Sequence, residues 1–249
     1  MKTTDNTILI MGGSAGIGFE IAKLFSEHGN HVIITGRNEE RLQAAAAKLK
    51  NVTAIKADVT SAASINSLAA RLEKDFPQLN ILVNNAGSAF VYNLAEPTVN
   101  AYAKAAEEIE TNYLSIIRLN EKLLPLLAKN DDAAIVNVTS IVAFAPNKLM
   151  TTYAASKAAL HAYTRGLRLW LAETGKVKVF ELMPPLVDTE FSKDIGGHNG
   201  MPAAGVAQEF FDGLRDDVYE IHVGQTAGFY KLSLSSPDDA LAAINQPRS

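Results

Sequence analysis

The chain of 249 residues contains no cysteine. It therefore has no disulfide, no cysteine-ligated zinc site and no thiol nucleophile. Basic residues are fewer than acidic ones, 23 against 27, so the net charge is −4 and a general nucleic-acid binder, which needs a basic face, is not expected. No apolar run approaches the ~20 residues that cross a bilayer, and the first six residues lack the apolar core of a signal peptide. We therefore expect a soluble, cytoplasmic protein that binds neither nucleic acid nor membrane.

Short apolar runs alternate with stretches of helical periodicity along nearly the whole chain. Strands are predicted at residues 7–11, 31–35, 52–56, 81–83, 133–139, 177–183 and 219–223. Helices are predicted at residues 16–29, 39–49, 61–76, 101–129 and 152–174. This alternation indicates βαβ units and a doubly wound, mostly parallel seven-stranded sheet with helices on both faces. We expect one α/β domain over residues 1–249, with the glycine-rich segment 188–205 as a mobile flap within it.

A glycine-rich loop lies between the first strand and the first helix. It reads Gly12-Gly13-Ser14-Ala15-Gly16-Ile17-Gly18. Glycines allow a tight turn and close approach of the backbone to a pyrophosphate, and the helix N-terminus offers amide donors. The alternative is a plain strand–helix turn, but this context near the N-terminus favours a dinucleotide-binding Rossmann fold.

The end of the second strand indicates which dinucleotide binds. An acidic residue there favours NAD, whereas this chain has Gly36 and then Arg37. A guanidinium can pair with a 2′-phosphate, and the Ser14 hydroxyl can assist, so NADP(H) is the expected cofactor and NAD(H) stays possible. Alternatively, Arg37 is a solvated charge or stacks on adenine. Asp58 is predicted to accept from the adenine amino group or to cap the following helix.

Tyr153 and Lys157 are four residues apart and share one face of a predicted helix. A phenol is a poor base at neutral pH because its pKa is about 10. A neighbouring ammonium lowers that pKa and makes the tyrosine a usable general acid or base. Ser140, 13 residues before Tyr153, ends a strand and can orient a carbonyl or carbinol oxygen.

Taken together, these motifs resemble those of the short-chain dehydrogenase/reductase family over nearly the whole chain. Within that family, the sequence looks most like bacterial oxidoreductases associated with lipoteichoic acid operons. The resemblance rests on the glycine loop and on four further matches in the same order: Asn84-Asn85-Ala86-Gly87, Asn112, Ser140 with Tyr153 and Lys157, and Pro184 to Thr189.

The resemblance implies a role for each matched residue. Tyr153 protonates the carbonyl oxygen or deprotonates the alcohol, Ser140 polarises that oxygen, and Lys157 binds the nicotinamide ribose. Asn112 holds a water that links Lys157 to solvent. Val187 and Thr189 grip the carboxamide. The expected cofactor-binding residues are Gly12, Ser14, Gly16, Ile17, Gly18, Arg37, Asp58, Asn85, Ala86, Gly87, Tyr153, Lys157, Pro184, Val187 and Thr189.

Two positions depart from the family pattern. Met11 stands where a threonine hydroxyl usually braces the glycine loop, and Pro185 stands where glycine is usual. Proline removes an amide donor and fixes φ.

The substrate is expected at the carboxyl ends of the strands. The candidate pocket residues are Ser88, Phe90, Val142, Phe144 and Met150, with the 188–205 flap. Their apolar character favours an apolar substrate, although ordinary packing explains them equally well. His198 is expected at the surface rather than on the substrate, and His161 faces an interface or a pocket. No metal site is expected.

Two function classes follow. The leading one is an NADP(H)-dependent carbonyl reductase or secondary-alcohol dehydrogenase, and the alternative is a non-catalytic NADP(H) sensor on the same fold. A sugar-nucleotide epimerase is disfavoured because only 60 residues follow Thr189. The family resemblance implies that two long helices pair with their symmetry mates, and the stretches 116–127 and 158–171 are apolar enough for that, so a homodimer or homotetramer is expected. A short helix after Ser235 is predicted to cover either the pocket or a neighbouring subunit.

Overall fold

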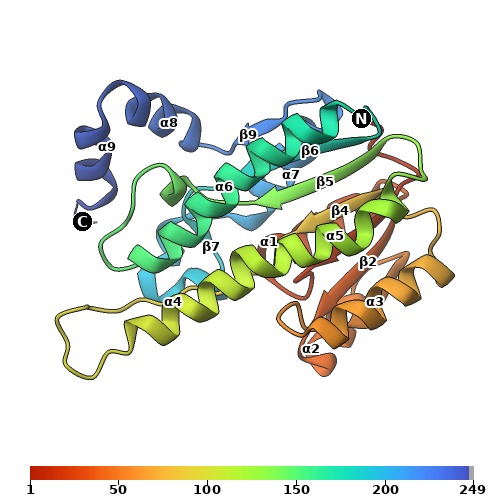
Figure 1. The fold of residues 1–249 in the computed structure, drawn as a ribbon, viewed down its shortest axis with the longest axis horizontal. Helices are drawn as coiled ribbons and strands as arrows, with labels where there is room; N and C mark the ends of the chain where they lie inside the picture. The colour runs from red at the N-terminus through yellow and green to blue at the C-terminus, as the bar shows by residue number, and fades with distance from the viewer. Residues whose placement is uncertain (247–249) are drawn as a thin grey trace.

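A seven-stranded parallel sheet forms the centre of the structure, a computed structural model in which residues 1–246 are described (Figure 1). The strand order is β3-β2-β1-β4-β5-β6-β9, and all neighbours are parallel. The strands are β1 (Thr7–Met11), β2 (His31–Gly36), β3 (Val52–Lys56), β4 (Ile81–Asn84), β5 (Ala133–Val138), β6 (Val177–Met183) and β9 (Glu220–His222). The predicted doubly wound sheet is confirmed, and its order reverses between β1 and β4, where such folds bind ligands.

The sheet is buried on both faces, so its strands are apolar at almost every position. Ile8 and Ile10 of β1 belong to one hydrophobic core, while Leu9 and Met11 belong to the other. The first core is completed by α1, α2 and α7, and the second by α3, α5 and α6. Figure 1 shows α5 and α6 lying side by side across one face of the sheet.

The helices predicted from the sequence begin close to their signals, whereas α7 and α8 were not predicted. They are α1 (Gly16–Glu27), α2 (Glu39–Ala46), α3 (Ala62–Asp75), α4 (Ala101–Ile109), α5 (Ser115–Leu127), α6 (Thr151–Ala172), α7 (Ala203–Arg215), α8 (Thr226–Ser235) and α9 (Pro237–Ile244). Asn38 and Ser61 cap α2 and α3 by accepting backbone N–H groups. Gly29, predicted to close the first helix, follows α1 with φ +78°. Among the described residues, no helix is long and apolar enough to cross a membrane.

The stretch predicted as one helix over residues 101–129 is helical without a gap from residue 101 to residue 127, but it is not α-helical throughout. A π-helical turn at Glu110–Leu114 separates α4 from α5. One extra residue enters the turn, so the side chains beyond it are rotated relative to a regular helix. Asn112 lies inside this turn and is fully buried.

The segment 188–205 is more ordered than its composition suggested. Within and beside it, β7 (Val187–Asp188) pairs with β8 (Met201–Pro202), and two 3-10 turns lie between them. Gly200 permits this pairing, because a Cβ there would stand 2.7 Å from Leu186 O. Its last residues already belong to α7. Mobility of this flap stays a prediction.

Candidate active site

The glycine loop after β1 takes a backbone shape that requires glycine. Gly12 and Gly16 have φ of +78° and +56°, in the left-handed region. A Cβ on Gly12 would lie 3.0 Å from Ala86 Cα, and one on Gly18 would lie 2.3 Å from Gly12 O. The loop therefore packs against itself and against the turn after β4.

Met11 does not leave this loop unsupported. The amides of Gly12 and Gly13 both donate to Thr35 O at 3.1 Å. Asn85 Nδ2 donates to Gly12 O at 2.9 Å and to Met11 O at 3.3 Å. The Met11 side chain is buried in the core beneath. Backbone bonds and the Asn85 amide thus brace the turn where a threonine hydroxyl is absent.

The N-terminus of α1 faces the same space with free donors. Ala15 occupies the N-cap position and has no side chain that accepts a hydrogen bond. The first amides of α1 therefore point outward without a capping partner, and the helix dipole adds partial positive charge. The N-terminus of α1 and the glycine loop beside it therefore form a site that suits a pyrophosphate.

A cavity of about 1090 Å³ runs from this loop to the ends of β5 and β6. It is slightly larger than the ~300–1,000 Å³ typical of small-molecule sites, so a dinucleotide and a small substrate fit together. Of the predicted cofactor residues, those lining it are Gly12, Ser14, Gly16, Ile17, Arg37, Asp58, Asn85, Ala86, Gly87, Tyr153, Lys157, Pro184, Val187 and Thr189. Gly18 lies beneath the loop against Gly12 O instead.

Two arginines stand at the β2 end of the cavity. Arg37 and Arg41 both line it and both are exposed, and Ser14 lies beside Gly36. Arg41 was not predicted, although its place in the first turn of a helix capped by Asn38 puts it beside the strand end.

Asp58 lies on the same rim. Its Oδ1 accepts from the backbone N–H and the hydroxyl of Thr60 at 3.0 and 2.7 Å, while Ser61 caps α3. The alternative that Asp58 caps the helix after β3 is therefore wrong, because Ser61 caps α3. Partial burial raises the pKa of its carboxyl, but the Thr60 hydrogen bonds and the charge of Arg37 outweigh it and hold that pKa below its usual value.

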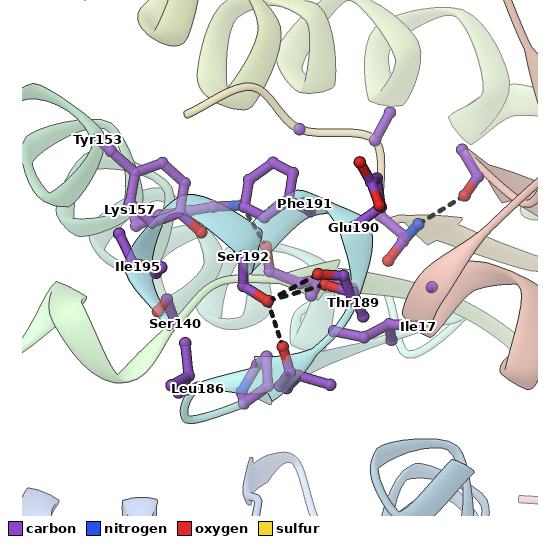
Figure 2. Close-up of a pocket in the computed structure, with 18 of the residues that line it drawn as sticks. Ile17, Ser140, Tyr153, Lys157, Leu186, Thr189, Glu190, Phe191, Ser192 and Ile195 are labelled. Carbon is purple, nitrogen blue, oxygen red and sulfur yellow. Dashed lines mark hydrogen bonds between the residues drawn. The ribbon is translucent and has the colours of Figure 1, made fainter. Parts of the chain in front are cut away.

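Tyr153, Ser140 and Lys157 meet at the other end of the cavity (Figure 2). Tyr153 on α6 and Ser140, which follows β5, both line this end, and hydrogen bonding by Ser140 acts on the pKa of Tyr153. Burial raises the pKa of the Tyr153 phenol, the Ser140 bond lowers it, and the charge of Glu108 raises it, so that the net pKa lies above its usual value.

Lys157 is buried one helical turn further along α6. Its Nζ donates to Val138 O at 2.8 Å and lies 5.7 Å from the centre of the Tyr153 ring. Burial lowers the pKa of Lys157 to about 8. The expected lowering of the Tyr153 pKa by Lys157 is not found in this arrangement, because burial of the phenol prevails.

Asn112 lies behind these residues and does not line the cavity. Its Nδ2 donates to Ser88 O and to Ser156 Oγ at 2.8 and 2.9 Å, and its Oδ1 accepts from Ser88 N at 2.8 Å. Both amide hydrogens are therefore used within the protein. That Asn112 holds a water stays a prediction.

The segment after β6 is held in place by Ser192. Its hydroxyl lies within hydrogen-bond distance of two acceptors, Val187 O and Thr189 O, and 3.2 Å from Thr189 Oγ1, as the dashed lines in Figure 2 show. Thr189 in turn lies against Gly16, where a Cβ would stand 3.2 Å from Thr189 Cγ2. Ser192 was missed in the sequence, although Thr-x-x-Ser at a turn is typical of such local hydrogen bonds.

The substrate residues predicted from sequence divide into two groups. Val142 and Met150 line the cavity. Ser88, Phe90 and Phe144 do not line it. Ser88 bonds to Glu107, Phe90 carries Lys104 over its ring at 4.5 Å, and Phe144 packs against His161 and Tyr230. Phe191 and Ile195 of the predicted 188–205 flap also line the cavity, and the apolar wall residues that were not predicted are Leu149, Leu186 and Ile244.

The C-terminal helix covers the cavity rather than standing apart from it. Ile244, Asn245 and Gln246 belong to its lining. Asn245 Oδ1 accepts from Lys148 N at 2.7 Å, and its Nδ2 donates to Pro146 O at 3.0 Å. Asn147 Nδ2 donates back to Ile244 O at 3.2 Å. The end of α9 is thus fastened to the loop before α6.

The histidines singled out in the sequence lie outside the cavity lining. His198 is exposed in the flap. His161 bonds through Nδ1 to Glu181 Oε1 at 2.8 Å. No group of metal-binding side chains occurs among residues 1–246.

Comparison with known proteins gives relatives of one kind. The family model for short chain dehydrogenases matches residues 6–199. An uncharacterised oxidoreductase of Bacillus subtilis, DltE, is 40% identical over 250 residues, with 98% of each chain covered. An uncharacterised oxidoreductase of Staphylococcus epidermidis, SERP2049, is 32% identical and covers 83% of this chain and 89% of its own.

Solved structures agree in fold. A short-chain dehydrogenase from Sphingobium yanoikuyae in complex with NADPH has a TM-score of 0.79 and 28% identity, covering 98% of each chain. One from Burkholderia cenocepacia in complex with NADP has a TM-score of 0.87 at 24% identity, covering 99% of this chain and 100% of its own, and shows the fold alone. The protein is therefore an oxidoreductase that belongs to the short-chain dehydrogenase/reductase family.

Proposed function

We propose that the protein is an NADP(H)-dependent reductase of ketones or aldehydes, or in the reverse direction a dehydrogenase of secondary alcohols. The observation that carries this is a single cavity with Tyr153, Ser140 and Lys157 at one end and Arg37 and Arg41 at the other. A hydride donor bound along such a cavity has its nicotinamide beside a proton donor. We also infer that residues 1–249 form one such domain.

The proton chemistry belongs to Tyr153. Because its pKa is raised, the phenol is protonated at neutral pH and can donate to a carbonyl oxygen. Ser140, which lines the same end of the cavity, would donate to the same oxygen and so stabilise developing negative charge. When bound, the nicotinamide supplies the hydride or accepts it. Lys157 is proposed to bind the ribose hydroxyls, exchanging its bond to Val138 O for them.

The choice of NADP(H) rests on the β2 end of the cavity. Arg37, Arg41 and the Ser14 hydroxyl offer a positive, hydrogen-bonding site for a 2′-phosphate, and no acidic side chain ends β2. The relative from Sphingobium yanoikuyae is in complex with NADPH, which supports the proposal, while a fold neighbour from Burkholderia phymatum is in complex with NAD. Use of NAD(H) at lower affinity is therefore part of the proposal.

The substrate end indicates an apolar molecule. Around Tyr153 the wall is formed by aliphatic and aromatic side chains, namely Val142, Leu149, Met150, Leu186, Phe191, Ile195 and Ile244. Such a wall stabilises an apolar ketone through the hydrophobic effect, while Tyr153 and Ser140 fix its oxygen.

The test is loss of reduced-nicotinamide absorbance with a panel of ketones and aldehydes, run in parallel with NADPH and NADH. Turnover that favours NADPH and rises with the apolar size of the ketone is expected. Tight NADPH binding without turnover of any carbonyl compound would favour the sensor instead.

A further inference from the structure

A buried carboxylate that the reaction does not use lies behind the catalytic residues. Glu181 on β6 is fully buried between β5 and β9. Its Oε1 accepts from Thr139 Oγ1 at 2.7 Å and from His161 Nδ1 at 2.8 Å. Its Oε2 has no hydrogen-bond partner among the described residues. Burying an incompletely paired carboxylate costs free energy that an apolar side chain would not, so packing alone does not account for it.

The two partners of Glu181 lead directly to the catalytic residues. Thr139 precedes Ser140, and the two residues extend β5 beyond its last pairing in the sheet. His161 follows Lys157 by one helical turn and Tyr153 by two, so it lies on the same face of α6. One carboxylate thus links the strand end that carries Ser140 to the helix that carries Tyr153 and Lys157.

The backbone around Ser140 shows what this link controls. Thr139 N donates to Leu182 O at 2.9 Å and Ile141 N donates to Pro184 O at 3.0 Å, which ties both sides of Ser140 to β6. These bonds hold the backbone on both sides of Ser140, and Ser140 Oγ also accepts from Val142 N at 3.3 Å. The bond from the Thr139 hydroxyl to Glu181 adds a side-chain anchor directly beside Ser140.

We infer that Glu181 is a positioning residue, which acts through Thr139 to aim the Ser140 hydroxyl at Tyr153, with His161 holding the carboxylate in place. This inference rests on the proposed reductase function. The other titratable side chains near the pair are His222 and Glu220 on β9.

The test replaces the Thr139 hydroxyl without disturbing the charges. Thr139→Val keeps the shape and removes the bond to Glu181, whereas Thr139→Ser restores it. Thr164→Val is the matched control, because Thr164 is also a buried threonine whose hydroxyl accepts from Asn137 and donates to Leu160 O, but it does not bond to the Ser140 segment.

For Thr139→Val we expect kcat for the best ketone to fall by about 10- to 100-fold, since a misaligned catalytic group costs that much. The Kd of NADPH should change by less than about twofold, because hydride-donor binding does not use this hydroxyl. Thr139→Ser should recover most of kcat. Thr164→Val should lower the melting temperature yet keep kcat. Unchanged kcat in Thr139→Val, or an equal loss in Thr164→Val, would overturn the inference.

A structural readout separates this inference from the proposed function. In crystal structures with bound NADPH, Ser140 Oγ should lie farther from Tyr153 Oη in Thr139→Val than in the wild type. An unchanged position of Ser140 Oγ contradicts the positioning role, whether or not any carbonyl compound is turned over. Absence of turnover in the wild-type protein contradicts only the proposed function.

Discussion

Burial acts in opposite directions on the two ionisable residues at the catalytic end of the cavity. It raises the pKa of Tyr153 and lowers that of Lys157 to about 8. Both shifts favour the neutral form, as expected for groups removed from water. The phenol is thereby kept as a proton donor. The Lys157 ammonium donates to Val138 O, and an anionic or hydroxyl-rich ligand that replaces this bond would stabilise its charged form.

The Lys157 shift has a consequence for stability. Below about pH 8 the folded protein holds a buried ammonium at a cost, whereas between about pH 8 and 10.5 the unfolded chain binds a proton that the folded one does not. The contribution of Lys157 to the free energy of unfolding therefore rises with pH through this window. Without cofactor, Lys157→Met should be most stabilising, relative to wild type, near neutral pH.

Urea unfolding of both proteins at several pH values checks this prediction. The difference in unfolding free energy should shift in favour of the wild type as pH rises from about 8 to about 10. Taking the difference removes the titration of the other groups that the proteins share. A difference that stays constant over that range contradicts the assigned burial effect.

Arg37 is expected to decide between the two dinucleotides. Arg37→Ala should raise the Kd of NADPH by about 10- to 100-fold, the loss of one charge-assisted hydrogen-bonded contact. It should leave the Kd of NADH within about threefold, because NADH has no 2′-phosphate. Isothermal titration calorimetry at two salt concentrations measures both. Arg71→Ala, an exposed arginine on α3 paired with Asp75, is the control. An equal loss of NADH affinity would indicate that Arg37 stacks on adenine.

At the scale of elements, the end of α9 is predicted to form one wall of the substrate site. Asn245→Ala removes the bonds to Lys148 N and Pro146 O that hold it. The KM of bulky apolar ketones should rise by about three- to tenfold, as about 1 kcal/mol of binding is lost. NADPH affinity should not change. Asn93→Ala, an exposed loop asparagine outside this cavity, should have neither effect. Equal KM values for Asn245→Ala and wild type contradict the assigned wall.

The elements also show what a sequence can and cannot predict. Strands 52–56 and 177–183 have the predicted bounds because short apolar runs and turn residues act locally. The π-helical turn at Glu110–Leu114 escapes such reasoning, because the hydrophobic period on either side is nearly unchanged. Asn112 was picked out, but its bonds to Ser88 and Ser156 depend on how distant segments pack.

The substrate wall was predicted less well for the same reason. Phe144 lies in the right loop, yet its ring turns toward His161 and Tyr230. Ile244 lies nearly a hundred residues from Met150 in sequence, and only the docking of α9 brings it to the same cavity. Short motifs that carry chemistry can be recognised in the sequence alone. Contacts between segments that are far apart in the chain can be assigned only when the fold is known.

For the whole molecule, we predict a homodimer or homotetramer built on the outer faces of α5 and α6. Leu169 and Trp170 are 74% and 58% exposed there, and large apolar side chains in such positions favour burial against another subunit. Leu169→Glu should therefore reduce the mass of the assembly. Leu234→Glu, the same change on α8 at 68% exposure, should not. Analytical ultracentrifugation decides, and a wild-type monomer, or equal masses for both variants, contradicts the prediction.

Tyr153 is the proposed proton donor of the reductase. The most direct test compares wild type with Tyr153→Phe in two measurements: NADPH binding, and NADPH consumption with the best ketone. Phenylalanine keeps the ring and removes the hydroxyl, so we predict that the Kd of NADPH changes by less than about threefold while kcat falls by about 10²- to 10⁴-fold. If Tyr153→Phe turns over the ketone at the wild-type rate, the central claim is wrong.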